Sequence, residues 1–497
     1  MLAIGMLVQA CGSLPRLEAV PPTLTEKAAI PGIPNSRYWL DHDLAPFIQA
    51  VIQDSKREDA ALSKAGKPIN PLPPANLLAI SGGGDAGAFA AGILTGWSAH
   101  GDRPEFKLVT GISAGALIAP FAFLGPQYDD VIRGVATSIG KKDVFHTRNT
   151  LMGLANDGMA DSEPLARLVA KYVTPEILRS IAREYARGRV LEIGTTDLDA
   201  GRAVTWDMGA IAASGAPGAL DLFRKLMIAS TSIPGAVSPV MIDVEIDGRH
   251  FQEMHVDGGV ITQVFLYPSR TTIELLRATG TPYHRELHAY IIHNGKLEPE
   301  WTNTKRRTMS IGGRAISALV QAQGINDVYR IYQTAQQDQV DFNLAYIGSD
   351  FNDTHVEQFN SAYMKRLFDY AYNSARKDTH GTKDRQSKYP PDLPVDTYLH
   401  RSQWHWQLGL GMMQWSYGYL NEFDLPRLSL PARDHCPLCV ALLSFQPELS
   451  RYSGDDARVG RGCLARGHPA LVSDLWSRVC PQASAPTGSL RRHLAPG

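Results

Sequence analysis

The feature that most constrains the fold of this chain is a pair of glycine-rich turns in residues 76–117. Residues 77–81 form a short apolar run that follows two prolines and precedes three glycines, which is typical of a buried strand. Residues 86–97 are rich in Ala and Leu and favour a helix. The same order begins again with an apolar run at residues 106–110. This part of the chain therefore predicts two successive strand–turn–helix units.

The second turn reads Gly111-Ile112-Ser113-Ala114-Gly115 and fits the G-x-S-x-G nucleophile elbow. In an elbow the serine lies on a sharp strand-to-helix turn, and small neighbours let the backbone approach closely while the hydroxyl points outward. Taken alone, Ser113 fits the N-cap of a helix equally well. Because both glycine turns follow a predicted strand and precede a predicted helix, the combination favours Ser113 as a nucleophile.

The first turn has an alternative interpretation as a nucleotide-binding loop. Gly82, Gly84 and Gly87 satisfy G-x-G-x-x-G, and Asp102 and Glu105 follow about twenty positions later. This interpretation leaves the serine elbow unexplained. The two acids also lie before the next strand, whereas a ribose-binding acid belongs at the end of that strand. No Lys-Ser/Thr pair follows the glycines, which disfavours a P-loop.

Charge and hydropathy exclude two classes of protein. The 497 residues include 49 basic and 50 acidic ones, so the net charge of −1 gives no electrostatic case for nucleic-acid binding. The hydrophobic content of 44% is ordinary for a globular protein. No run of 18 apolar residues occurs, so we predict no membrane-spanning helix. The length allows one large domain with appendages or two domains.

The N-terminal residues resemble those of a bacterial lipoprotein. Residues 1–10 are mostly apolar, and Val8-Gln9-Ala10-Cys11-Gly12-Ser13 is similar to a lipobox, in which the cysteine is acylated. We therefore expect 1–35 to be a signal and tether, with Cys11 attaching the protein to a membrane of the bacterial cell envelope. A signal peptide requires a Lys or Arg before its apolar run, and this sequence has none there. A start codon placed too far downstream would explain the difference. An apolar N-terminus with an incidental cysteine is the alternative.

The remaining pattern predicts an α/β protein with helices on both faces of a sheet. A helical N-terminal extension is expected at 36–74 and a catalytic domain at 75–378. Within them we expect helices at 36–64, 116–124, 220–230, 311–339 and 357–376, and strands at 190–195, 203–206, 287–293 and 340–347. Asp161, just before a Ser-Glu-Pro sequence, is expected to cap a helix. Asp257 ends a short strand before Gly258-Gly259, and by itself it predicts only a turn.

Four features in this order resemble the patatin-like phospholipase family. They are the glycine loop at 82–87, the elbow at 111–115, Ser232-Ile233-Pro234, and Asp257-Gly258-Gly259. The resemblance implies a three-layer α/β/α fold that hydrolyses acyl ester bonds in lipids with a Ser-Asp dyad. It implies that Ser113 is the nucleophile, that Asp257 is the base, and that Gly82, Gly83 and Gly84 form the oxyanion hole. It implies no metal and no cofactor, a lipid or acyl ester as substrate, and contact with a membrane surface.

One departure from the family keeps other functions open. Ala86 stands where the family commonly has Arg or Lys. Loss of that cation predicts lower activity, a shifted substrate preference, or a degenerate, envelope-anchored binding protein. A further alternative is an ordinary α/β-hydrolase whose Ser-His-Asp triad is completed by His284, His288 or His293.

The C-terminal stretch, 379–497, differs in composition from the rest of the chain. It holds four of the five cysteines and an aromatic cluster; these residues are Cys436, Cys439, Cys463, Cys480, Trp404, Trp406, Trp415, Tyr417 and Tyr419. The aromatic residues fit either a bilayer interface or packing on the catalytic body. Cys436 and Cys439 have the two-residue gap of a zinc knuckle, but no second C-x-x-C follows. We expect an unusual C-terminal extension here.

Overall fold

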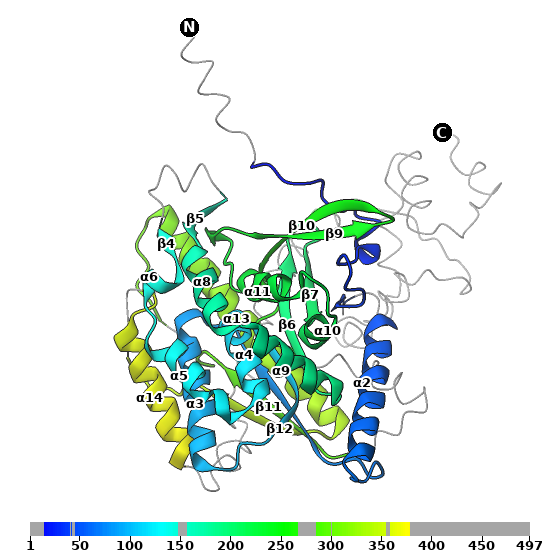
Figure 1. Ribbon diagram of the computed structural model, residues 1–497. Coiled ribbons are helices and arrows are strands. Elements are labelled where there is room, and N and C mark those ends of the chain that lie inside the picture. The colour runs from blue at the N-terminus through cyan, green and yellow to red at the C-terminus, as the bar shows by residue number, and fades with distance from the viewer. Residues whose placement is uncertain are drawn as a thin grey trace, which may run out of the picture. The chain divides into compact units, whose positions relative to one another are not determined.

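A nine-stranded mixed sheet lies at the centre of the computed structural model (Figure 1). The structure describes residues 14–39, 41, 45–147, 157–266, 285–299, 301–353 and 358–377. These residues belong to the first of two units of the chain, Met1–Tyr389. Cys11, His284, the aromatic cluster at 404–419 and the four C-terminal cysteines lie outside the described residues.

The sheet is parallel from β6 to the edge strand β12, and antiparallel pairs occur on the other side. The strand order is β1-β7-β6-β3-β2-β11-β12, with β10 paired to β6 and to β9. Strands β6, β3, β2, β11 and β12 run parallel to one another, whereas β7, β1, β10 and β9 pair antiparallel. The bounds are β1 Arg37–Tyr38, β2 Ala75–Ile80, β3 Phe106–Ile112, β6 Val190–Asp197, β7 Arg202–Asp207, β9 Val240–Ile246, β10 Arg249–Asp257, β11 Leu287–His293 and β12 Asp341–Tyr346.

A small second sheet and eleven helices surround this centre in the described part of the chain. The small sheet consists of β4 His146–Thr147, β5 Gly158–Asp161 and β8 Gly235–Val237. The helices are α2 Ala45–Lys64, α3 Gly87–His100, α4 Ala114–Leu124, α5 Asp129–Thr137, α6 Lys141–Val144, α8 Glu163–Tyr172, α9 Pro175–Ala186, α10 Met208–Ala213, α11 Ala219–Ser230, α13 Thr308–Asp338 and α14 Ser361–Lys377. None of these described helices combines the length and the hydropathy that a membrane crossing requires.

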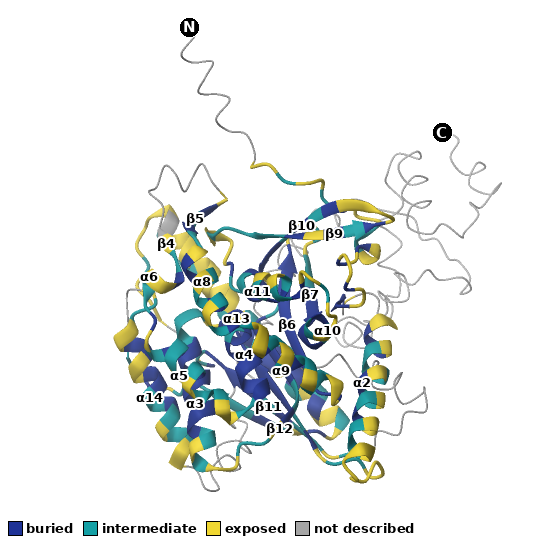
Figure 2. Cartoon of the chain, viewed as in Figure 1, coloured by how far each residue is buried: buried dark blue, intermediate teal, exposed yellow. Residues whose placement is uncertain are grey.

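Strand β2 shows why the protein has three layers. Its side chains alternate between the two faces of the sheet. Leu78 and Ile80 belong to the large core that includes residues of α3, α4 and α14. Leu77 and Ala79 belong to a second core with α13. Because both faces of the strand are covered, its residues 77–80 are all apolar, and the predicted α/β/α fold is confirmed. The central strands of the sheet accordingly appear dark blue between helices with exposed outer faces, whereas the β9–β10 hairpin is partly exposed (Figure 2).

The segment expected to be a tether is instead bonded to the sheet in its described part. Arg16 forms an ion pair with Asp199, and the backbones of Ala29 and Glu245 exchange hydrogen bonds. The apolar side chains of Val20, Ile30 and Ile33 are buried in the large core. The following helix also begins later than predicted, at Ala45, because Arg37–Tyr38 pairs with β7 as strand β1. Apolar burial and edge pairing therefore override the loop-like composition.

Candidate active site

Ser113 lies on the turn between β3 and α4, as the elbow pattern predicts. Its backbone has φ 53° and ψ −121°, a conformation that side-chain-bearing residues rarely adopt and that costs about 1–3 kcal/mol. A Cβ atom on Gly115 would lie 2.2 Å from the carbonyl oxygen of Ile80, so only glycine allows this close approach. The Ser113 N–H donates to Ser230 Oγ at 2.9 Å, and that hydroxyl donates to the Gly194 carbonyl. These contacts hold the strained turn in place.

Asp257 ends β10 directly beside this serine. Ser113 Oγ donates a hydrogen bond to Asp257 Oδ2 at 2.6 Å, and the Gly259 N–H donates to Asp257 Oδ1 at 2.8 Å. The Asp257 N–H donates to the Ser232 carbonyl, which connects the third motif to the site. Burial raises the pKa of Asp257 to about 6, and the two hydrogen bonds lower it by less. A carboxylate with this pKa is a better proton acceptor than an exposed aspartate.

The histidines of the triad alternative are placed elsewhere. His288 lies 2.9 Å from a carboxylate oxygen of Asp341. His293 is buried, and burial lowers its pKa to about 4. Both carboxylate oxygens of Asp257 accept hydrogen bonds, from Ser113 and Gly259, and among the described histidines none joins Asp257 to Ser113. His284 lies outside the described residues.

The glycine loop lies against Ser113. A Cβ atom on Gly82 would lie 3.3 Å from Ser113 Cβ, and one on Gly83 would lie 2.6 Å from Asn294 Cβ. Gly83 and Gly84 have φ values of 154° and 58°, which glycine adopts without strain. The Gly82 N–H donates to the Gln263 carbonyl at 3.0 Å, so it is not available to a substrate. Gly83 and Gly84 do not use their N–H groups within the described part of the chain.

Two polar residues that we did not predict from the sequence hold this loop. The Asn294 side chain accepts from the Ala90 N–H at 3.0 Å and donates to the Ser81 carbonyl at 2.9 Å. Gln263 donates its side-chain amide to the Gly259 carbonyl, while its N–H donates to Asp327 Oδ2. Asn294 directly follows a parallel strand, where functional side chains gather in α/β sheets, so its position is a usable sequence signal. Gln263 carries no such signal.

The geometry also disfavours the nucleotide-binding alternative. Asp102 and Glu105 precede β3 at its amino end, whereas Ser113 and the glycine loop lie at the carboxyl ends of β3 and β2. The Asp102 side chain contacts His100, and Glu105 forms an ion pair with Arg187. Neither acid is positioned to bind a ribose held at the glycine loop.

Other sequence predictions near the site have separate outcomes. Ala86 ends the short helix η3, Gly84–Ala86, and is partly buried against the large core. Asp161 Oδ1 accepts from the Glu163 N–H and so caps the first N–H group of α8, as we predicted, although the N-cap position itself is Ser162. A small apolar pocket lies between α4, α5, α8 and α11, and Leu117, one helical turn after Ser113, forms part of its wall.

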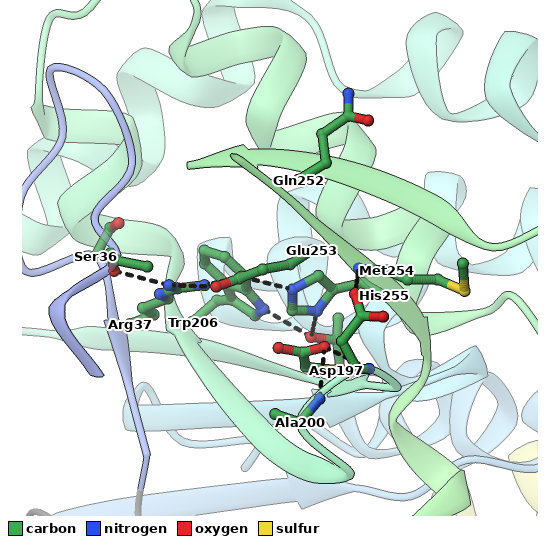
Figure 3. Close-up of polar contacts among 12 residues, drawn as sticks. Ser36, Arg37, Asp197, Ala200, Trp206, Gln252, Glu253, Met254 and His255 are labelled. Atoms are coloured by element: carbon green, nitrogen blue, oxygen red, sulfur yellow. Dashed lines mark hydrogen bonds and ion pairs between the residues drawn. The ribbon is translucent and has the colours of Figure 1, made fainter. Parts of the chain in front are cut away.

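A second buried polar cluster lies where β10 pairs with β6 (Figure 3). Asp197, Glu253 and His255 have potential metal-ligating atoms within 4.8 Å of one another. However, Arg37 already forms a two-point ion pair with the Glu253 carboxylate, including a contact at 2.9 Å. A metal ion bound by Glu253 would have to displace this guanidinium. We therefore interpret the cluster as an ion-pair network.

The hydrogen bonds of the network run from Trp206 through Thr195 and His255 to Glu253. The Trp206 ring N–H can only donate, so Thr195 Oγ1 accepts from it at 2.8 Å, and Thr195 Oγ1 also shares a hydrogen bond of 2.9 Å with His255 Nδ1. His255 Nε2 then donates to Glu253 at 3.1 Å. The positive charge of Arg37 and these donors hold the pKa of Glu253 at about 2, despite burial that raises it. Glu253, His255 and Asp257 alternate along β10 and share one face of it.

Fold and site together define a three-layer α/β/α protein that carries a buried serine–carboxylate pair beneath a glycine loop. Residues 78–267 match the family model for patatin-like phospholipases, so the chain carries a domain of this lipid acyl hydrolase family. Among solved structures, the chain is similar to VipD from Legionella pneumophila, with 11% sequence identity and a TM-score of 0.26. The match covers 61% of this chain and 67% of that chain. The comparison with curated proteins gave no match.

The ion-pair network yields a prediction for stability. We expect Arg37→Met to lower the free energy of unfolding by about 3–5 kcal/mol, because it leaves the Glu253 carboxylate buried without its counter-charge. The double variant Arg37→Met/Glu253→Leu should recover most of this loss. Urea unfolding of the three proteins at neutral pH measures the difference. Equal stabilities of wild type and Arg37→Met would contradict the interpretation.

Proposed function

We propose that this protein is a serine lipid acyl hydrolase in which Ser113 is the nucleophile and Asp257 is its general base. The observation that carries the proposal is the direct hydrogen bond of 2.6 Å between Ser113 Oγ and Asp257 Oδ2. A serine hydroxyl is a weak nucleophile until a neighbouring base accepts its proton. The raised pKa of Asp257, about 6, suits that base.

The proposed first step is attack of Ser113 Oγ on the ester carbonyl carbon as its proton passes to Asp257. The carbonyl oxygen then carries negative charge in a tetrahedral intermediate. We assign its stabilisation to the N–H groups of Gly83 and Gly84, each such donor being worth about 3–4 kcal/mol. Gly82 shapes the loop, since its own N–H is bonded to Gln263. The partial positive charge at the start of α4 adds to this stabilisation.

Collapse of the intermediate releases the alcohol, which takes the proton from Asp257, and leaves an acyl ester on Ser113. Water then attacks this ester with Asp257 again as base, which restores the serine and releases the fatty acid. The apolar pocket that begins at Leu117 is our candidate for contact with the acyl chain. Ala86 provides no cation at the loop, so in this proposal the oxyanion depends on backbone groups alone.

The dyad predicts a specific pattern of activity. We expect Ser113→Ala and Asp257→Asn each to lower kcat/KM on p-nitrophenyl esters by at least about a thousandfold. The capping residue Asp161 provides the matched control, and Asp161→Asn should keep the wild-type rate. If wild type is inert, or if either site variant keeps its rate, the hydrolase proposal fails and a binding function on this fold is favoured.

Thermal unfolding shows whether the Asp257 variant is folded. The folded-state pKa of Asp257 lies above its ordinary value, so the ionised carboxylate destabilises the fold as pH rises through about 4 to 6. Asp257→Asn removes this buried charge, so we expect the free energy of unfolding at neutral pH to increase by up to about 3 kcal/mol. Loss of activity together with equal or greater stability therefore identifies a chemical role.

The pKa of Asp257 also predicts a pH dependence. We expect kcat/KM to fall about tenfold per pH unit below about pH 6, since the protonated carboxyl cannot accept the serine proton. An exposed aspartate would delay this fall to about pH 4. Rates on a short-chain ester between about pH 4 and pH 8 measure it, with enzyme returned to neutral pH as the control for irreversible loss. A flat profile above pH 4 would contradict Asp257 as the base.

The proposal extends to attachment at a bacterial envelope membrane through Cys11. The lipobox-like sequence from Val8 to Ser13 is the support for it, and these residues lie outside the described part of the chain. In bacteria fed a labelled fatty acid, we expect wild type to incorporate label and to fractionate with membranes, and Cys11→Ser to incorporate none. Equal labelling of the two proteins would refute acylation at this cysteine.

A further inference from the structure

The first half of α13 carries large apolar side chains that the described part of the protein leaves uncovered. Ile311, Ile316, Leu319 and Val320, which we call the α13 apolar stripe, are all exposed, Leu319 at 70% and Ile316 at 59% of their surfaces. The second half is buried through Val328, Ile331 and Ala335. Patches of exposed apolar side chains on a folded protein commonly mark an interaction site.

The stripe extends from the solvent side of the helix toward its core side. Successive residues rotate by about 100°, so Leu319 lies about 140° around the axis from Gly324, which contacts the core, whereas Ile316 and Val320 lie about 80° and about 40° from it. Ser310, Arg314, Ser317 and Gln321 occupy the remaining side of this half. The first half of α13 is therefore amphipathic in its own right, with its apolar side directed at solvent.

The charged residues within the stripe's own segment are of one sign, although the exposed Glu298 adjoins it, its carbonyl accepting from the Gln321 side chain at 2.8 Å. Between Trp301 and Asn326 the sequence has four basic residues and no acidic one. Three of the four form a basic turn, Lys305-Arg306-Arg307, directly before the helix. Trp301, four residues earlier than Lys305, has 87% of its surface exposed. Basic residues beside an exposed tryptophan and an apolar helix face match the chemistry of an anionic lipid interface.

The stripe is also close to the proposed active site along the helix. A Cβ atom on Gly324 would lie 2.8 Å from His293 and 3.6 Å from Gln263, whose carbonyl accepts from the glycine loop. Leu319 and Ile316 precede Gly324 by five and eight residues, or about 7.5 and 12 Å along the axis. Val260, three residues after Asp257, is exposed as well. A lipid surface that contacts the stripe thus approaches the catalytic end of the sheet.

We propose that the α13 apolar stripe and the basic turn dock the protein on an anionic lipid surface. The stripe enters the boundary between head groups and acyl chains, while Lys305, Arg306 and Arg307 contact anionic head groups. The proposal rests on the proposed function, since it gives a lipid hydrolase access to lipids that stay in the bilayer. A protein partner would need acidic groups opposite the basic turn, and anionic lipids supply that charge directly.

Vesicle flotation tests the proposal without turnover and without the Cys11 anchor. The full chain carrying Cys11→Ser and Ser113→Ala is mixed with vesicles of phosphatidylcholine, alone or with about one third phosphatidylglycerol. We expect binding to the anionic vesicles that weakens with salt. Ile316→Glu/Leu319→Glu should weaken it by at least about tenfold, and Arg306→Glu/Arg307→Glu by a similar factor.

Matched controls place the same changes elsewhere on the surface. Ile69→Glu introduces a charge at an exposed isoleucine of the loop before β2, and Lys64→Glu/Lys67→Glu reverses two exposed charges at the end of α2. Both should bind vesicles as the parent chain does, and thermal unfolding should show that every variant is folded.

Three outcomes would overturn the proposal. They are no vesicle binding by the parent chain, unchanged binding after the stripe variants, and a lipid-free dimer that the stripe variants dissociate. The last would show that a second copy covers the stripe. Ester hydrolysis by the chain with Ser113 intact is measured separately on a soluble substrate, so failure of docking and failure of the hydrolase proposal are distinguishable.

Discussion

The buried carboxylate of Asp257 is the interaction on which the rest of the site depends. A negative charge removed from water is costly unless hydrogen bonds compensate it, and among the described residues the Ser113 hydroxyl and the Gly259 N–H are the groups that do so. Burial outweighs this partial compensation, so the pKa of Asp257 is raised to about 6, above that of an exposed aspartate. The serine is therefore a stabilising partner of the carboxylate and, in the proposed mechanism, the group that the carboxylate activates.

Strand β10 fixes the position of this carboxylate from several sides. It pairs with β6 and β9, and its Glu253 and His255 join the buried network that includes Arg37 of the N-terminal segment. Replacing such a network by apolar residues would often cost little, so its value lies in specifying one arrangement. Arg37 connects a segment of loop-like composition to the strand that ends in Asp257. The N-terminal segment is in this way part of the domain that carries the site.

The sequence was most informative where local chemistry and position in the chain agree. The strand at 287–293, the helix behind Ser113 and the cap at Asp161 were predicted correctly, because apolar runs, glycine turns and capping residues act over a few positions. The docking of residues 16–33, the late start of α2, and strands β4, β5 and β8 were not predicted, because their pairing partners do not adjoin them in sequence and no local pattern encodes them. Strand β9 was also missed, although it forms a hairpin with β10 through Asp247-Gly248, which is a local signal in the sequence.

By itself, the sequence determined an α/β fold and placed Ser113 and Asp257 each at the end of a strand, since glycines that permit close backbone approach must follow them. Only the tertiary structure decided that the two side chains meet, 144 positions apart, because the pairing of β10 with β6 depends on contacts across the sheet. The tertiary structure also decided that Gly82 donates to Gln263 rather than to a substrate, and that Ser230, Gln263 and Asn294 support the site. Hydrogen bonds between distant segments leave no periodic signal, so these partners appear only when the chain is folded.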